Sequence, residues 1–166
     1  MDRLTQPLRD EHASLRPQVD ALREIADLAE QLPPTELAAR LAAATAFLHG
    51  HLLVHAHVEE AALYPVVEWA IGGMGATATM ARDHIEIARL AGQVDDVRSV
   101  VGSGPVRPEE LPRLRQVLYG LHAVILLHFA KEEEIYLPLL DERLSPDAAA
   151  RLFASMDEEA AKEAAA

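Results

Sequence analysis

One pattern occurs twice in this chain, and the repeat restricts the folds available to it more than any other feature. Residues 47–65 read FLHGHLLVHAHVEEAALYP, and residues 120–138 read GLHAVILLHFAKEEEIYLP. Upstream of each copy stands a lone histidine, within DEH at 10–12 and within RDH at 82–84. The sequence therefore consists of two similar halves, and each half carries a lone histidine followed by His-x-x-x-Glu.

Apolar residues recur at alternating spacings of three and four, which is typical of helices that bury one face. The segments with this pattern are about 4–31, 35–71, 77–101 and 109–142, with a shorter one at 146–163. Aromatic residues are only 4 % of the chain, too few for a large sheet, whereas Ala and Leu favour helix. We therefore predict an all-α fold.

Short connections between long amphipathic helices favour an antiparallel up-down-up-down four-helix bundle. We expect the bundle to span about 4–142 and an additional C-terminal helix to span about 146–163, all within a single domain of residues 1–166. Thr35 and Ser145 are the expected N-caps of the second and last helices. Prolines inside three predicted helices should kink them, because proline donates no backbone hydrogen bond; they are Pro17, Pro65 and Pro138.

The two histidine–glutamate pairs have the spacing that places two side chains on one helical face. His55 precedes Glu59 by four residues, as His128 precedes Glu132, and all four lie in the apolar stripes of their helices. The lone histidines also lie in apolar stripes, and they are His12 and His84. Six polar groups should therefore meet in the core.

Two interpretations of this cluster are open, a structural polar network and a metal site. A buried carboxylate without a partner costs several kcal/mol, and metal coordination would satisfy all six groups at once. Imidazole and carboxylate ligands without thiolate suit iron, manganese or zinc. Two ions fit the twofold pattern best, with Glu59 and Glu132 in bridging positions.

Charge and composition exclude other classes of function. A net charge of −12 argues against nucleic-acid partners and anionic membrane surfaces. The absence of cysteine excludes disulfides and thiolate sites. No signal peptide and no uninterrupted apolar run of membrane-spanning length is apparent, so we expect a cytoplasmic protein.

With these motifs the sequence resembles the hemerythrin-like, HHE cation-binding family over residues 4–142. The matching motifs are DEH, HAHVEEAALYP, RDH and HFAKEEEIYLP. The resemblance implies a four-helix bundle that holds two non-heme iron ions joined by an oxo or hydroxo bridge, with zinc or manganese as substitutes. The implied ligands are His12, His55, Glu59, His84, His128 and Glu132. A small diatomic molecule or peroxide would be the exogenous ligand.

Two departures from the oxygen-carrying members of that family bear on function. Those members have a second histidine four residues from the lone one on the third helix, where this chain has Met80 and Ala88. They also place the acid of the fourth helix five residues after its histidine, which would be Glu133 here. We prefer Glu132 as the ligand, because Glu133 would point inward only from a bulged helix.

The remaining polar and aromatic residues receive simpler interpretations. His51 is an additional candidate ligand or supporting group, and His57 is expected to face solvent. His49 and His122 are expected on partly exposed helix flanks, with a supporting role as the alternative. An acidic, solvated face is expected from Glu60, Glu133 and Glu134. The tyrosines and Trp69 are expected in the core or at its rim.

Three functions are consistent with the sequence. The first is a diiron protein that binds or senses O2, NO or peroxide, or handles iron. The second is a diiron enzyme that decomposes peroxide or reduces NO. The third is a regulatory module whose shape depends on the metal and whose last helix contacts a partner protein. The sequence does not determine the oligomeric state.

Overall fold

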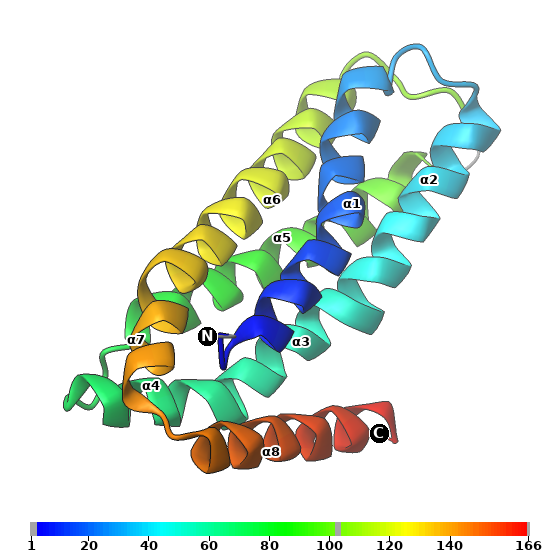
Figure 1. The fold of residues 1–166 in the computed structure, drawn as a ribbon. Helices are drawn as coiled ribbons and strands as arrows, with labels where there is room; N and C mark the ends of the chain where they lie inside the picture. The colour runs from blue at the N-terminus through cyan, green and yellow to red at the C-terminus, as the bar shows by residue number, and fades with distance from the viewer. Residues whose placement is uncertain (1–2, 102–103, 166) are drawn as a thin grey trace.

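The fold was obtained as a computed structural model, which describes residues 3–101 and 104–165. All regular secondary structure in these residues is helical, which confirms the predicted all-α class. Four rods and a separate last helix make up the fold (Figure 1). The first and third rods are the single helices α1 (Gln6–Leu28) and α5 (Ala78–Val101).

The second and fourth rods alternate between α-helix and wider π-helical turns. The second rod contains, in order, α2 (Pro34–Phe47), η1 (Leu48–Leu52), α3 (Leu53–Val58), η2 (Glu59–Leu63) and α4 (Tyr64–Ile71). The fourth rod contains α6 (Leu111–Lys131), η3 (Glu132–Tyr136) and α7 (Leu137–Arg143).

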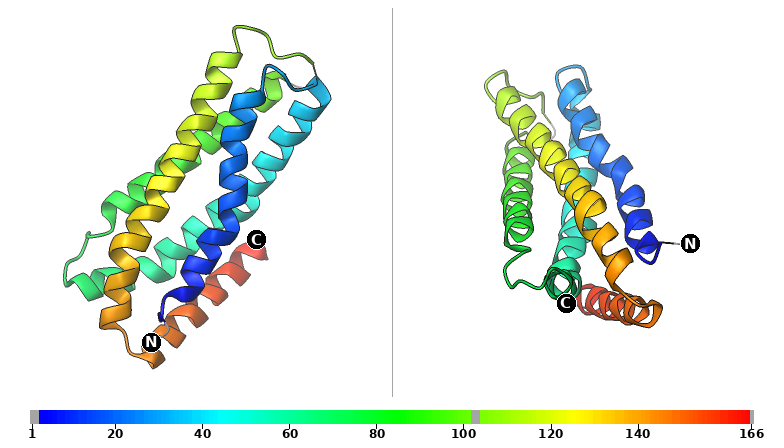
Figure 2. Two further views of the ribbon diagram at one scale, coloured as in Figure 1. Left: turned by 45° about the horizontal axis from the view of Figure 1, so that its top comes forward. Right: turned by 60° about the vertical axis from the view of Figure 1, so that its left-hand side comes forward.

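The rods pack in a ring, and at one end the second and fourth rods also meet, through α4 and α7. α1 packs against α2 and α6, and α5 packs against the same two helices from the other side. The last helix, α8 (Pro146–Ala164), crosses the end of the bundle at which the N-terminus lies (Figure 2). It rests on α3 and η2, and its Leu152 and Met156 join the core there.

Two apolar clusters form the core, and the polar residues of the repeat lie between them. The helices α1 and α5 pass from one cluster to the other at their histidines. On α1, His12 lies between Leu8 of one cluster and Leu15 of the other. On α5, His84 lies between Met80 and Ile87 in the same way. The bundle thus contains a polar layer with apolar packing above and below.

The predicted N-caps and kinks had different outcomes. Ser145 caps α8, because its hydroxyl accepts the backbone N–H of Ala148. Thr35 does not cap α2, since that helix begins at Pro34 with Pro33 in the N-cap position. Helix α1 continues through Pro17 as one helix.

π-helical turns precede Pro65 and Pro138, the other two prolines that were expected to kink their helices. Tyr64 donates its backbone N–H to the carbonyl of Glu59, and Leu137 donates to Glu132, five residues back in each case. Each proline follows directly, at the start of the next α-helix, where its missing N–H is tolerated. The irregularity that the prolines predict is therefore a widened turn at the glutamate of each repeat.

One rod is long and apolar enough to cross a membrane by length and composition. The rod Pro34–Ile71 contains an 18-residue window of mean hydropathy 1.4, of which 33 % is buried. The prediction concerned uninterrupted apolar runs, and histidines interrupt this rod, so the prediction is not contradicted. Core helices of soluble proteins have the same composition, and this rod carries two of the buried polar residues of the repeat.

Candidate metal centre

Six buried side chains from six helical segments meet in the polar layer of the bundle. Each is at most 5 % exposed, although all can carry charge. They are His12 on α1, His55 on α3, Glu59 on η2, His84 on α5, His128 on α6 and Glu132 on η3. The structure thus brings together all six residues that the repeat singles out.

One pair of histidines faces one oxygen of each glutamate. The Nε2 atom of His55 lies 3.0 Å from Oε1 of Glu59, and that of His12 lies 3.6 Å from the same oxygen. The Nε2 atom of His12 also lies 3.3 Å from Oε2 of Glu132. These atoms lie within 4.8 Å of one another, close enough to coordinate a single metal ion.

The second pair of histidines faces the other oxygen of each glutamate. Oε2 of Glu59 lies 3.3 Å from Nε2 of His84 and 3.7 Å from Nε2 of His128. Oε1 of Glu132 lies 3.5 Å from Nε2 of His128. Each carboxylate therefore spans the two histidine pairs, with one oxygen directed to each.

Several atoms at the centre of this cluster have no hydrogen-bond partner. They are Nε2 of His12 and His55, both carboxylate oxygens of Glu59, and Oε2 of Glu132. Leaving a buried polar group unsatisfied costs about 1–3 kcal/mol, more if it is charged. Lone pairs that converge without donors are what a bound cation requires, so the residues fit a metal.

Without a cation, the pKa values of three residues in the cluster depart from their usual ranges. Burial tends to lower the pKa of His12, but the nearby carboxylates of Glu132 and Glu59 outweigh it and raise the pKa to about 9. Burial raises the pKa of Glu132, and the adjacent charge of Glu59 raises it further. Burial also opposes ionisation of Glu59, but His55 and the other imidazoles hold its pKa well below the usual range.

A carboxylate stands behind each imidazole, at the nitrogen that faces away from the cluster. The distances from Nδ1 are 3.1 Å from His12 to Glu133, 3.0 Å from His55 to Glu11, 2.8 Å from His84 to Glu60 and 3.3 Å from His128 to Asp83. An Nδ1–H that donates to a carboxylate leaves Nε2 free to bind metal and fixes the ring orientation. The sequence analysis missed this arrangement.

Two of these carboxylates, Glu60 and Glu133, were expected only as part of a solvated acidic face, and the structure corrects that expectation. The side chains of Glu60 and Glu133 are 45 % and 40 % exposed, yet each accepts a hydrogen bond from a buried imidazole. The repeat could have identified these four acids, because each is adjacent in sequence to one of the six residues of the cluster, and the pattern occurs in both halves. Glu11 precedes His12 in the way that Asp83 precedes His84.

Two aromatic rings stack on the lone histidines. Phe129 lies parallel to His12 with ring centroids 4.1 Å apart, and Tyr64 lies nearly parallel to His84 at 5.5 Å. The Tyr64 hydroxyl donates to Oε1 of Glu132 at 3.2 Å and lies 3.2 Å from Nε2 of His84. Tyr64 is thus a contact of the cluster, although the sequence placed it only in the core or at its rim.

The remaining candidates lie outside the cluster. Glu133 is directed to the outer nitrogen of His12, while Glu132 points inward even though both belong to a π-helical turn. His51 is exposed on η1, and His57 is exposed as expected. Further along the helices, His49 bonds Asp95 and His122 bonds Asp20.

The third rod provides one histidine to the cluster. Met80, one turn before His84, is 2 % exposed and packs in an apolar cluster with Leu8 and Tyr64. Ala88, one turn after, is exposed. Neither position offers a further nitrogen or oxygen ligand.

Comparisons with known proteins agree with the geometry. A search of curated proteins and a search of solved structures found no match. A scan against protein-family models matched residues 3–140 to the hemerythrin HHE cation binding domain. That match covers all four rods except the last turn of α7, and it includes all six residues of the cluster. The chain therefore belongs to the hemerythrin HHE cation binding domain family.

Proposed function

We propose that the protein is a non-heme diiron protein that binds or senses O2 or related small molecules such as NO and peroxide, or handles iron. The observation that carries the proposal is the division of the oxygens of Glu59 and Glu132 between two histidine pairs. Two bridging carboxylates offset half of the four positive charges of two divalent ions.

Each ion would be held by one histidine pair together with one oxygen from each glutamate. His12 and His55 would hold one ion, and His84 and His128 the other. Bound iron supplies redox chemistry and coordination positions that the protein leaves open. The outer carboxylates keep the Nε2 atoms directed inward, and Tyr64 fixes Glu132 through its hydroxyl.

A cavity beside one residue of the cluster supports access of small molecules toward this site. A cavity of about 300 Å³ is lined by His55 and its partner Glu11 on one side, and by Met156 and Asp157 of α8 on the other. Its other lining residues include the exposed His51. A ligand of diatomic or peroxide size would approach between α8 and the bundle, on the side of His55 that carries Glu11.

Antiparallel order of the rods is part of the proposal. Neighbouring rods in the ring are also consecutive in the chain, apart from the pair formed by α1 and α6. Short connections between consecutive neighbours favour alternating directions, up-down-up-down. The two halves of the repeat are then related by a pseudo-twofold axis that passes between the histidine pairs.

Anaerobic addition of ferrous iron to metal-free protein, followed by air, tests the proposal. About two iron atoms per chain should bind, since the cluster has two histidine pairs. Near-ultraviolet charge-transfer bands should appear after oxidation, without the paramagnetic resonance signal of isolated ferric ions. Binding of one iron or none would contradict a dinuclear site.

A metal-dependent regulatory module is the second candidate, and the position of α8 favours it. That helix packs on η2, the turn that carries Glu59, so metal binding and the seating of α8 share one structural element. Hydrogen exchange of α8 amides should slow when metal binds. Exchange rates of α8 that do not respond to chelation would contradict the coupling.

A further inference from the structure

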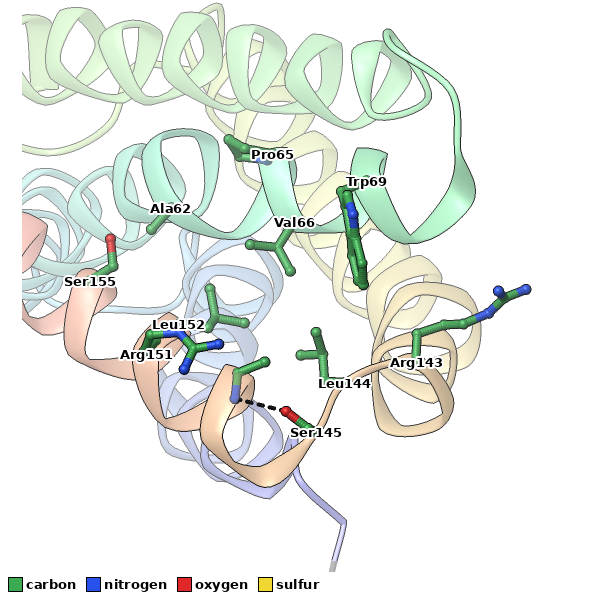
Figure 3. A pocket seen from close by; sticks show the side chains of 11 residues that line it. Ala62, Pro65, Val66, Trp69, Arg143, Leu144, Ser145, Arg151, Leu152 and Ser155 are labelled. Atoms are coloured by element: carbon green, nitrogen blue, oxygen red, sulfur yellow. Dashed lines mark hydrogen bonds between the residues drawn. The ribbon is translucent and has the colours of Figure 1, made fainter.

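A cavity of about 620 Å³ lies between α4 and the beginning of α8 (Figure 3). None of the six residues of the metal cluster lines it. Its volume falls within the range of about 300–1,000 Å³ that is common for small-molecule sites. Apolar side chains form most of its walls, including Val66 and Pro65 from one side and Leu144 and Leu152 from the other.

Trp69, the single tryptophan of the chain, stands at the edge of this cavity. Its side chain is 68 % exposed, and Figure 3 shows its indole ring directed toward Leu144, beside Val66. A large indole surface left in water beside apolar walls favours an apolar ligand, since a ligand that covers it removes that surface from water.

Positive charge accompanies the apolar walls. Arg143 and Arg151 both line the cavity, and among the described residues neither takes part in an ion pair with a carboxylate. Figure 3 shows the guanidinium of Arg151 turned toward the lining residues, and that of Arg143 directed outward. In a chain of net charge −12, most other basic side chains are paired with acids.

The start of α8 forms one wall of the cavity. Ser145 and Ala148 line the cavity, and the only drawn hydrogen bond joins the serine hydroxyl to the alanine N–H (Figure 3). Asp147 in the first turn of α8 offsets the partial positive charge of the helix start, so the positive charge at the cavity comes from the arginines. Apolar walls, an exposed indole and an unpaired guanidinium together match a ligand with an apolar body and one negative group.

We propose that this cavity binds a small amphipathic carboxylate. Its apolar body would lie between Val66 and Leu152 against the indole of Trp69, and its carboxylate would pair with Arg151. The guanidinium fork suits a carboxylate, because two parallel N–H donors match its two oxygens. The site would function independently of the metal cluster, so its test does not depend on the identity of the metal.

Intrinsic fluorescence tests the proposal directly, because all tryptophan emission of the chain comes from Trp69. Decanoate serves as the probe, at concentrations below those at which it aggregates. A saturable blue shift of the emission is expected. Decanol, which lacks the charge, should bind roughly tenfold more weakly, since a charge-assisted hydrogen bond contributes about 1.5–3 kcal/mol.

Two substitutions at exposed arginines sharpen the test. Arg151→Gln should weaken decanoate binding roughly tenfold and leave decanol binding unchanged. Arg98→Gln is the matched control, since Arg98 is exposed in the last turn of α5 and does not line the cavity. It also takes part in none of the ion pairs of the described residues. This variant should leave both affinities unchanged.

Three results would overturn the proposal. The first is an emission spectrum of Trp69 that decanoate does not change. The second is equal affinity for decanoate and decanol together with no effect of Arg151→Gln. The third is a response to vesicles of anionic phospholipid without any response to soluble decanoate, which would identify the cavity as part of a membrane-binding surface.

Discussion

Replacing Glu59 with glutamine should remove most of the stabilisation that metal confers on this protein. Glu59 has one oxygen within 3.6 Å of each histidine in the first pair and the other within 3.7 Å of each in the second. One substitution therefore weakens both halves of the site. Glutamine has nearly the same size as glutamate, so the change removes charge while it preserves the packing.

The magnitude follows from the linkage between binding and folding. At free metal a thousand times the Kd, one site contributes about 4 kcal/mol, or about 8–16 °C in the Tm of a chain of this size. Loss of a residue that is hydrogen-bonded to a metal ligand weakens metal binding about 10–100-fold, and loss of a ligand should do at least as much. A hundredfold weaker site leaves about 1.4 kcal/mol, or about 3–6 °C.

Differential scanning calorimetry of the same variant with ferrous iron and with chelator measures this increment. Any change in the stability of the metal-free form cancels in the difference, and helical circular dichroism checks that the variant folds. Glu36→Gln is the matched control, because Glu36 lies exposed on α2 and, among the described residues, forms an ion pair with Arg40 alone. A Glu59→Gln protein with the full metal-dependent increment would refute the assignment of Glu59 as a bridging ligand.

Three further substitutions test other parts of the site. Glu60→Gln removes the carboxylate behind His84 and should weaken metal binding about 10–100-fold, as measured by competition with a chelator. Tyr64→Phe removes the hydroxyl that bonds Glu132, so Tm should fall by about 2–4 °C with metal content unchanged by elemental analysis. Phe129→Ala removes a ring that is 5 % exposed and should cost about 3–5 kcal/mol in urea unfolding.

Each of these substitutions has a control on the surface of the same protein. Glu86→Gln removes an exposed acid that pairs with Arg89, and metal affinity equal to that of Glu60→Gln would contradict the role of Glu60. Tyr119→Phe removes an exposed hydroxyl, and loss of metal on Tyr64→Phe alone would show that Tyr64 is a ligand instead. Leu127 is 61 % exposed, so Leu127→Ala should cost less than about 0.5 kcal/mol.

Helical content and the six central residues were predictable because both follow from periodicity. A spacing of four fixes the relative direction of His55 and Glu59 wherever the helix packs, and the apolar stripe determines which face is buried. The repeat then supplies the twofold correspondence between the halves. The chemistry of the cluster follows from residue type, since buried imidazoles and carboxylates need a cation or one another.

Cross-helix partners were not predictable, because sequence spacing does not show which helices become neighbours. Glu11 bonds His55 on another rod and not the adjacent His12, since consecutive residues of a helix point about 100° apart. The stacking of Tyr64 on His84 depends likewise on the packing of α4 near α5. The prolines predicted an irregularity, but its form as a widened turn depends on the whole rod.

By itself, the sequence determined that this protein is helical, that six polar residues lie in its core, and that they suit metal, because all three follow from local periodicity and residue chemistry. Tertiary structure alone decided how Glu59 and Glu132 divide their oxygens, which carboxylate stands behind each imidazole, and that α8 and α4 border a separate cavity. Such relations join residues far apart in the chain, and only packing brings them within a few ångströms.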